Sequence, residues 1–270
     1  MKAHLTQYKR NRLGIANDGI FFGNGKDYGH ILPEQLKNLN ILEQVRSEFW
    51  EYYEAKRKEL PLHTYFHHLN SSQAFAFNLF FPWFGMDESP APLLSALGVA
   101  GRVVNKWQFE AMPNQAEGTS IDFYAEFAGG SRLLVEVKLT ENQFGKSLPN
   151  ERRQTKLRDT YAPSLANKVH PTMLEEGNFF LHYQLCRNIS QLDLVKGDTL
   201  VLLLPRANEF TWHDALRFRD EQLTESCRAA VRVVAVEDLI STLMATPGIS
   251  GRLRQYLSLL AEKYLPPLGP

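Results

Sequence analysis

Asp122, Glu136 and Lys138 are the residues whose types and spacing best suit chemistry. They lie in two segments of alternating polar and apolar residues, SIDFYAEF (120–127) and RLLVEVKL (132–139). A carboxylate pair could hold a divalent cation, because Mg²⁺ favours oxygen ligands. Such a cation polarises a phosphoryl oxygen and lowers the pKa of a bound water. Lys138 could then orient that water or stabilise the charge that develops on a phosphate.

The two segments are expected to pair as an antiparallel hairpin around Ala128-Gly129-Gly130, because the glycines supply the positive φ that a three-residue loop needs. If Phe127 pairs with Ser131, Asp122 lies opposite Glu136. Lys138 then follows one step along on the same face. The other face would hold only apolar side chains, and this alternation supports the register. Its members are Ile121, Phe123, Ala125, Phe127, Leu133, Val135, Val137 and Leu139.

Opposed carboxylates carry a cost, because like charges directly across a sheet are destabilising. A cation between Asp122 and Glu136 would offset that repulsion. The alternative is a solvated face on an edge strand, since a Glu-x-Lys sequence in a strand is common by itself. The combination of a hairpin, opposed carboxylates and a fully apolar opposite face favours a functional site.

The surrounding apolar patterns predict a mixed α/β chain. Ser71-Ser72 could cap a buried helix that ends before Pro82, because proline disfavours helical geometry in the residue before it. The first forty residues are rich in Gly and Asn and are expected to be irregular. Helices are expected over 33–60, 72–81, 175–189 and 251–265. Strands are expected over 102–111, 120–127, 132–139, 200–205 and 229–240.

The block GTSIDFYAEF-AGG-SRLLVEVKLTE resembles the Asp…Glu-x-Lys signature of the PD-(D/E)XK nuclease superfamily. The order of helix, three-strand meander, helix and strand also matches the core of that superfamily. The chain is further similar to restriction-endonuclease-like bacterial proteins in LNSSQAFAFNLFFP and HYQLCRN. Ile121 stands where the superfamily's name implies a proline, a replacement that is widespread among its members.

The resemblance implies a restriction-endonuclease-like α/β fold with a mixed central sheet in α-β-β-β-α-β order. We expect a single nuclease-like domain over residues 1–270, with its core at about 70–205. A helical N-terminal lead-in at 33–60 and an α/β C-terminal extension at 206–270 would be added to that core.

The function implied by the resemblance is Mg²⁺-dependent endonucleolytic hydrolysis of DNA, with Mn²⁺ able to substitute, in restriction or another defence role. A homodimer is a weaker expectation, because many relatives act as dimers to cut two strands. Two alternatives stay open. The chain could keep a nuclease fold only to bind nucleic acid or protein, or it could cleave RNA or branched or damaged DNA.

The resemblance also points to supporting residues. Many members add an acidic residue near the first strand, so Glu110 is expected as an auxiliary metal ligand, although a surface charge at the strand end is the simpler alternative. Gln184, Arg187 and Asn188 share one helical face through their i,i+3 and i,i+4 spacing. Gln184 could orient a water and Arg187 could contact phosphate. Alternatively, Arg187 pairs with a carboxylate and the amides face solvent.

Other polar residues have less specific roles. The densest basic stretch near the hairpin includes Lys146, Arg152, Arg153 and Lys156, and such side chains give sequence-independent affinity for phosphates. Acidic neighbours dilute this stretch, so a solvated face is the alternative. Gln73 and Asn78 lie in an otherwise apolar helix and need hydrogen-bond partners. They could support the site from behind or hold neighbouring loops.

Bulk composition sets few limits on function. The 30 Lys and Arg residues balance 30 Asp and Glu residues, so any nucleic-acid contact needs a local basic patch. Two cysteines are too few for a disulfide framework. The sequence has no apolar run that predicts a secretory signal or a membrane span, so a cytoplasmic location is expected. His63, His67 and His68 lack a third metal ligand nearby and are expected in aromatic packing or at the surface.

Overall fold

The computed structural model describes residues 1–114, 118 and 120–267, and the chain forms two compact units. The first unit combines Met1–Ala100 with Val236–Pro270, and the second is Gly101–Ala235. The chain therefore leaves the first unit and returns to it. The expectation of a single domain with a core at 70–205 stays a prediction.

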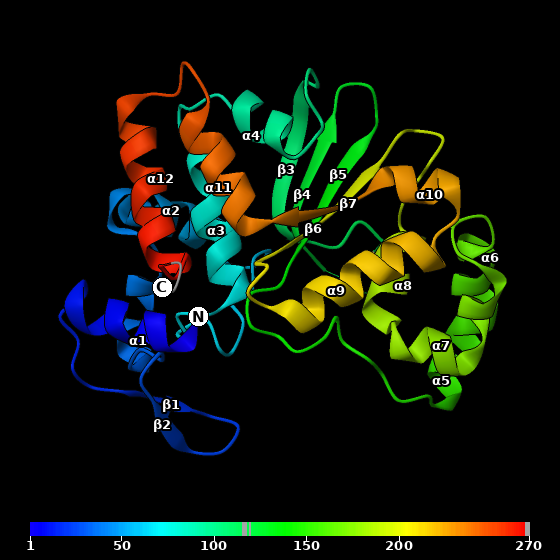
Figure 1. Ribbon diagram of the computed structural model, residues 1–270, viewed down its shortest axis with the longest axis horizontal. Helices are drawn as coiled ribbons and strands as arrows, with labels where there is room; N and C mark the ends of the chain where they lie inside the picture. The colour runs from blue at the N-terminus through cyan, green and yellow to red at the C-terminus, as the bar shows by residue number, and fades with distance from the viewer. Residues whose placement is uncertain (115–117, 119, 268–270) are drawn as a thin grey trace. The chain divides into compact units, whose positions relative to one another are not determined.

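The second unit is built on a five-stranded sheet in the order β3-β4-β5-β6-β7 (Figure 1). Its strands are β3 (Val104–Ala111), β4 (Ile121–Phe127), β5 (Arg132–Val137), β6 (Thr199–Leu204) and β7 (Val231–Ala235). The first three strands run antiparallel to their neighbours, whereas β5, β6 and β7 are parallel. This mixed sheet confirms the predicted restriction-endonuclease-like fold class.

The β4–β5 hairpin has the predicted register. The Phe127 backbone N–H donates to the Ser131 carbonyl at 2.9 Å, and Gly130 has a φ of 79°. Tyr124 pairs with Leu134 in the ladder. All eight apolar residues predicted for one face are buried. The apolar alternation therefore identified the register correctly.

The helices of the second unit lie between β5 and β6 and between β6 and β7 in the sequence. They are α5 (Glu151–Lys156), α6 (Ala162–Leu165), α7 (Glu176–Leu181), α8 (Tyr183–Ser190), α9 (Glu209–Arg217) and α10 (Glu225–Ala230). Shorter turns are the π-helical η2 (Leu157–Tyr161) and η4 (Phe218–Gln222) and the 3₁₀ turn η3 (Pro171–Leu174). The core joins α7 and α8 to the sheet through residues such as Phe179, Cys186, Leu134 and Leu202.

The prediction of one continuous helix over 175–189 is wrong. The helix breaks at His182, whose φ and ψ are −108° and 32°. A continuous helix would join the Gln184 N–H to the Phe180 carbonyl. Instead, that N–H donates to Gly145 at 3.2 Å, and Ser147 donates to Phe180 at 2.9 Å. The loop at 145–147 thus replaces a helical hydrogen bond, which apolar periodicity does not reveal.

The first unit contains the helices that remain. Its elements are α1 (Lys2–Asn11), β1 (Gly19–Phe21), β2 (Lys26–Tyr28), the 3₁₀ helix η1 (Glu34–Asn40), α2 (Glu43–Lys56), α3 (Ser72–Phe84), α4 (Ala91–Ala96), α11 (Val236–Ala245) and α12 (Gly251–Tyr264). The predicted helices at 33–60 and 251–265 are confirmed in outline, the former as η1 and α2. No helix in the described part of the chain is long and apolar enough to span a membrane.

The expectation that the first forty residues are irregular is wrong, because they form α1 and a β1–β2 hairpin. Lys9, which is fully buried, anchors this segment. Its ammonium lies 2.7 Å from the Asp18 carboxylate and donates to the carbonyls of Asn17 and Ile31. A charged side chain therefore organises this region, and hydrophobic patterns do not report such an anchor.

Helix α3 extends two residues past Pro82, where it was predicted to stop. Proline lacks the N–H that would bond the Asn78 carbonyl. The Tyr256 hydroxyl, from α12, donates to that carbonyl at 2.7 Å. A long-range partner thus satisfies the group that proline leaves open. The predicted cap is confirmed, since Ser71 accepts from the Ala74 N–H.

The buried amides of α3 hold neighbouring loops. Asn78 accepts from the Leu42 N–H at 2.8 Å and donates to the Asn40 carbonyl at 2.9 Å. Gln73 accepts from the His63 N–H at 2.8 Å. These bonds agree with the loop-holding alternative for both residues.

The strand predicted at 229–240 is shorter in the structure. Only Val231–Ala235 is extended, and α10 and α11 flank it. Glu237 and Asp238 lie in the first turn of α11, where acidic side chains stabilise a helix N-terminus. The apolar residues after Ala235 therefore belong to a helix whose start is marked by those charges.

Candidate active site

Asp122, Glu136 and Lys138 converge at the end of the β4–β5 hairpin. The Lys138 ammonium lies 2.8 Å from the Glu136 Oε1 atom, so both side chains are on the predicted face. Asp122 is opposite Glu136, one residue beyond the Phe123–Val135 pair. The Val137 N–H donates to the Asp122 Oδ2 atom at 2.6 Å. The predicted register and the shared face of Glu136 and Lys138 are therefore confirmed, and the assignment of the three residues to a metal site stays a prediction.

Asp122 is half-buried. Burial raises the pKa of this carboxyl well above its usual value, and the charges of Glu136 and Glu110 raise it further. Lys138 and the Val137 N–H act in the opposite direction. The surroundings thus disfavour the ionised form of Asp122, mainly through burial.

Lys138 is held as an ammonium group. Burial, the largest single effect, would lower its pKa, but the charges of Glu136, Asp122 and Glu141 outweigh it and raise the pKa above its usual value. The side chain is 12% exposed. A fixed, partly accessible positive charge therefore lies beside the carboxylates.

Glu136 is 3% exposed and accepts hydrogen bonds on both carboxylate oxygens. Besides Lys138, Gln184 donates to Oε1 at 2.7 Å, and Asn188 donates to Oε2 at 3.1 Å. Gln184 was predicted at the site, whereas Asn188 was only noted as sharing its helical face. The i,i+4 spacing of the two amides was the signal that could have identified Asn188.

Asn188 also has an unused hydrogen-bonding atom. Its side chain is fully buried, and its Oδ1 atom has no partner among the residues that the structure describes. Buried polar atoms of this kind are rare and call for a ligand or an ordered water. Asn188 therefore presents an open acceptor next to Glu136.

Gly145 fixes the approach of Gln184. Its φ of 77° is a conformation that residues with a Cβ atom rarely adopt. A Cβ atom added there would lie 3.0 Å from the Gln184 Oε1 atom. Glycine at this position thus lets the Gly145 carbonyl accept from the Gln184 backbone N–H while the side-chain amide of Gln184 donates to Glu136.

The arginines from two helices meet at one aromatic ring. The guanidinium of Arg187 lies 5.0 Å from the Tyr183 ring centroid, and that of Arg153 lies 6.0 Å from the same centroid. Lys146 and Arg152 are exposed, and Lys156 is half-buried on α5. The structure brings Arg153 and Arg187 together and leaves the roles of all five basic residues as predictions.

Glu110 lies across from Asp122 on β3, between the pairs Phe109–Phe123 and Ala111–Ile121. Its φ of 47° is unusual for a residue other than glycine, and such backbone strain costs on the order of 1–3 kcal/mol. Strained residues of this kind concentrate at functional sites. Within the described residues, no three His, Cys, Asp or Glu side chains are grouped closely enough to hold a metal ion. The role of Glu110 as an additional metal ligand thus stays a prediction, which its strained backbone favours and the absence of such a group among the described residues does not support.

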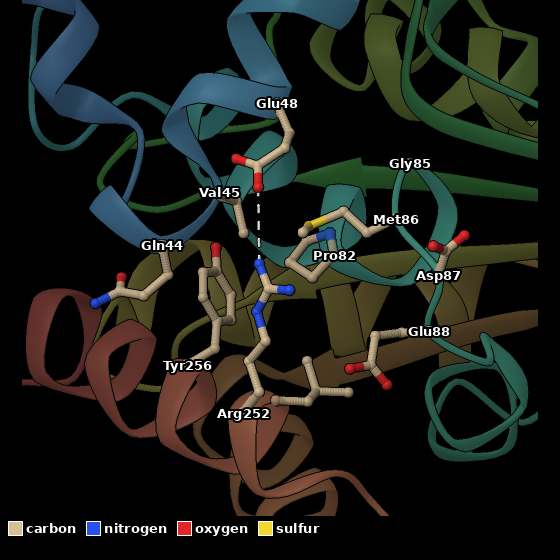
Figure 2. A pocket seen from close by; sticks show the side chains of 11 residues that line it. Gln44, Val45, Glu48, Pro82, Gly85, Met86, Asp87, Glu88, Arg252 and Tyr256 are labelled. Carbon is tan, nitrogen blue, oxygen red and sulfur yellow. Dashed lines mark ion pairs between the residues drawn. The ribbon is translucent and has the colours of Figure 1, made fainter.

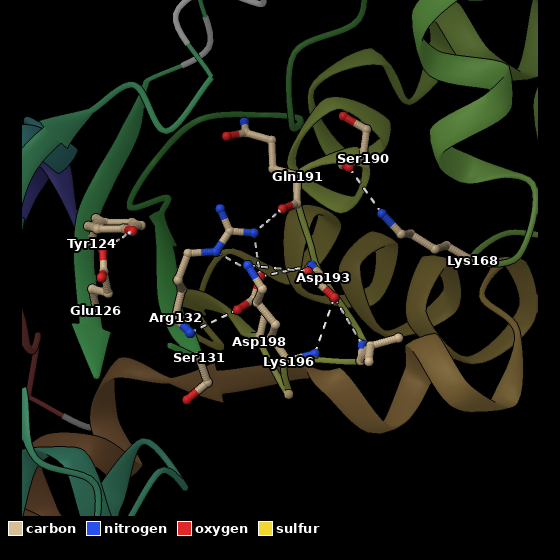
Figure 3. A network of polar contacts seen from close by, with 12 residues as sticks. Tyr124, Glu126, Ser131, Arg132, Lys168, Ser190, Gln191, Asp193, Lys196 and Asp198 are labelled. Atoms are coloured by element: carbon tan, nitrogen blue, oxygen red, sulfur yellow. Dashed lines mark hydrogen bonds and ion pairs between the residues drawn. The ribbon is translucent and has the colours of Figure 1, made fainter. Parts of the chain in front are cut away.

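A polar network at the opposite end of β5 anchors the hairpin to β6 (Figure 3). The buried Asp198 carboxylate accepts from the Arg132 backbone N–H at 2.8 Å and from its Nε atom at 2.9 Å. Asp198 also accepts from the Asp193 N–H at 2.8 Å. These bonds fix the start of both strands and so the register that places Glu136.

A separate hollow of about 360 Å³ lies within the first unit (Figure 2). Its acidic side chains are largely engaged, since Glu48 faces Arg252 at 3.7 Å and Glu88 accepts from Ser250 at 2.7 Å. The lining contains none of the predicted site residues. The candidate active site therefore remains the carboxylate cluster of the second unit.

The mixed sheet and its carboxylate–lysine cluster define a restriction-endonuclease-like protein. The chain belongs to the family described as restriction endonuclease associating with ARP, whose family model matches residues 2–265. This match includes both units. Neither the curated proteins nor the solved structures contain a significant match.

Proposed function

We propose that this chain is a divalent-metal-dependent endonuclease that hydrolyses phosphodiester bonds in DNA. The main support is the cluster of Asp122, Glu136 and Lys138, in which opposed carboxylates share a face with an ammonium group. A restriction or defence role agrees with the family description. The family description also names an association with ARP, and we propose the same association for this chain.

The donor set suits Mg²⁺, with Mn²⁺ as a substitute. Asp122 and Glu136 supply hard oxygen ligands, and Mg²⁺ sites often use one or two carboxylates completed by water and substrate phosphates. Burial, and after it the charges of Glu136 and Glu110, raises the pKa of Asp122, and a bound cation would favour its ionised form. The chemistry that such a cation supplies is polarisation of the phosphoryl group and activation of water. Glu110 is our candidate for an additional ligand.

The protein's own groups would then position the reacting atoms. Gln184 and Asn188 hold the two Glu136 oxygens, and Gln184 is our candidate for orienting a water. Lys138 would stabilise negative charge on the phosphate in the transition state. Arg187 and Arg153 would contact DNA phosphates beside Tyr183, and Lys146, Arg152 and Lys156 would extend that contact by charge alone.

A binding-only nuclease fold is the main alternative. The presence of Asp122, Glu136 and Lys138 in one cluster disfavours it, because a site that has lost activity usually lacks one of these groups. Cleavage of RNA or of branched or damaged DNA is a second alternative. A homodimer and a cytoplasmic location belong to the proposal as predictions.

A cleavage assay with the full chain tests the proposal. Plasmid DNA, single-stranded DNA and RNA are each incubated with the protein in Mg²⁺, in Mn²⁺ and in chelator. We expect DNA cleavage with either metal and none in chelator. Cleavage that persists in chelator would contradict metal dependence, and exclusive cleavage of RNA would overturn the substrate. Binding of DNA without cleavage in either metal would support the binding-only alternative.

A further inference from the structure

A second cavity in the first unit brings aromatic rings, imidazoles and an ammonium group together. It has a volume of about 280 Å³, near the lower end of the range for small-molecule sites. Its lining includes Lys2, Phe21, Tyr28, His30 and His68. These side chains play no part in the hydrolytic chemistry proposed above, so their convergence needs a separate explanation.

The backbone around this cavity is held by long-range hydrogen bonds. Ile31 forms an antiparallel bridge with His68, and the Leu69 N–H donates to the His30 carbonyl at 3.1 Å. The buried Lys9 ammonium donates to the Ile31 carbonyl at 3.1 Å. The two histidines are therefore fixed before any ligand arrives, which reduces the entropic cost of binding.

Aromatic rings form the walls. Phe21 and Tyr28 meet edge to face, with their ring centroids 6.1 Å apart. Phe21 lies 5.7 Å from His68, and Tyr28 lies 5.9 Å from His30, again edge to face. Protein sites that bind unpaired bases use aromatic side chains of this kind as stacking surfaces.

The histidines supply polar atoms inside this aromatic lining. Both are 9% exposed, and burial lowers the pKa of each to about 4, so they are neutral near pH 7. The His68 Nε2 atom lacks a hydrogen-bond partner in the described part of the chain. A neutral imidazole offers one donor and one acceptor. Base edges present donors and acceptors in the same way.

Lys2 adds a positive charge at the cavity. Its side chain is exposed, yet its charge contributes to the lowered pKa of both His30 and His68. The ammonium therefore lies close to the imidazoles while it remains open to solvent. A ligand that combines an aromatic heterocycle with a phosphate would match the aromatic walls, the hydrogen-bonding atoms of the imidazoles and the Lys2 ammonium.

We propose that this cavity binds the base of one nucleotide, with Lys2 at the attached phosphate. The nucleotide is either an unstacked residue of a single strand or a free mononucleotide, since both present the same chemistry. The inference relies on the proposed nuclease function for the choice of nucleic acid. It deepens that function by placing a base contact outside the hydrolytic residues.

The test measures binding by the full chain in chelator, where the proposed cleavage cannot occur. The probes are a short single-stranded oligonucleotide with one 2-aminopurine, an abasic oligonucleotide of equal length, and each deoxynucleoside monophosphate. Phe21→Ala and Lys2→Ala are compared with Phe22→Ala and Lys26→Ala, which change exposed residues of the neighbouring β1–β2 hairpin outside the cavity lining.

We expect Phe21→Ala to weaken binding of the base-containing probe about tenfold or more, as loss of a stacking partner does. Phe22→Ala should retain binding, and the abasic probe should bind more weakly than its counterpart. Equal loss in Phe21→Ala and Phe22→Ala would overturn the inference, as would equal binding of the two oligonucleotides. Tight binding of the monophosphates that depends on Phe21 would identify the free nucleotide as the ligand.

Thermal unfolding of each variant separates loss of binding from loss of the fold. If Phe21→Ala unfolds, Lys2→Ala with its matched control Lys26→Ala decides the question, because Lys2 is exposed. Retained base binding in a chain that cleaves nothing would overturn the nuclease proposal alone. Metal-dependent cleavage without any base binding at Phe21 would overturn the present inference alone.

Discussion

Asn188 donates its Nδ2 hydrogen to the Glu136 Oε2 atom at 3.1 Å and leaves its own Oδ1 atom without a partner among the described residues. Gln184, one turn earlier on α8, donates to the other carboxylate oxygen. The two amides thus hold the Glu136 carboxylate in one orientation. Removal of either amide should therefore disturb the orientation of the Glu136 carboxylate, whereas removal of Glu136 would eliminate the proposed metal ligand itself.

We expect Asn188→Ala to lower the free energy of unfolding by ~1.5–3 kcal/mol, the usual contribution of a buried hydrogen bond to a charged group. It should also reduce kcat for cleavage, because Glu136 loses one of its fixed contacts. Asn188→Asp should be more harmful, since it places a like charge beside Glu136. Urea unfolding and single-turnover cleavage measure the two effects. A variant with unchanged stability and rate would show that the contact is incidental.

Asp122→Asn should abolish cleavage, with a loss of roughly 100-fold or more in rate. In the absence of metal its stability should be equal to that of the wild type or slightly higher, because a like-charge repulsion disappears. Glu126→Gln, on the same strand, is the matched control and should keep activity. A large loss of stability in metal-free thermal unfolding of Asp122→Asn would identify Asp122 as a structural residue.

Arg187→Ala should lower the cleavage rate at saturating metal by roughly 10- to 100-fold while metal affinity changes little, because a phosphate contact acts on the substrate and its transition state. Arg187→Lys should recover little if the contact is bidentate. Arg217→Ala, at an exposed position of α9, is the control. Wild-type cleavage by Arg187→Ala would remove this arginine from the site.

Gly145→Ala should destabilise the protein by ~1–2 kcal/mol, because alanine is strained at a positive φ. It should also disturb Gln184, whose Oε1 atom would lie 3.0 Å from the new Cβ atom. Gly177→Ala is the matched control, because Gly177 lies in α7 with open space around it. Alanine should be neutral or stabilising there. Equal behaviour of the two variants in thermal unfolding would contradict this explanation.

His30 and His68 make the stability of the first unit depend on pH. Burial is the main cause that lowers their pKa from 6.5 to about 4. The unfolded chain takes up these protons below about pH 6.5, and the folded protein does so only below about pH 4. The free energy of unfolding should therefore fall as the pH decreases through this window, by at most ~3 kcal/mol per histidine.

The measurement compares wild type with His68→Phe by urea unfolding between pH 7.5 and 4. The difference in their free energies of unfolding should change in favour of His68→Phe as the pH falls. His213→Asn, which changes an exposed residue of α9, is the control and should follow the wild type. A difference that stays constant with pH would contradict the proposed linkage.

The hairpin was predictable because its information is local. Period-2 alternation and a glycine loop determine both the register and the face on which Asp122 and Glu136 lie. The break at His182 was not predictable, because it depends on hydrogen bonds to Gly145 and Ser147, which are distant in sequence. The extension of α3 past Pro82 similarly depends on Tyr256, and the order in the N-terminal segment depends on the buried Lys9. Sequence patterns report burial well, but they do not report which polar group will satisfy another.

The candidate site shows the same difference between what a local pattern predicts and what depends on long-range contacts. Gln184 was expected near the carboxylates from a resemblance and a helical spacing, and its contact with Glu136 agrees with that expectation. The unpartnered Oδ1 atom of Asn188 and the left-handed conformation of Glu110 were not foreseen. Both result from three-dimensional packing around the β4–β5 hairpin, which no one-dimensional pattern contains.

The bonds between Asp198 and Arg132 join positions 66 residues apart. The β4–β5 hairpin can form from neighbouring residues, but its pairing with β6 must wait until that long intervening segment has closed. Helix α8, which carries Gln184 and Asn188, lies inside the segment. We therefore expect the hairpin to form first and the amides to arrive last, so that Asp122 and Glu136 would face each other in solvent before the groups that enclose them are in place. Divalent cations present during folding can meet these carboxylates while water still reaches them freely.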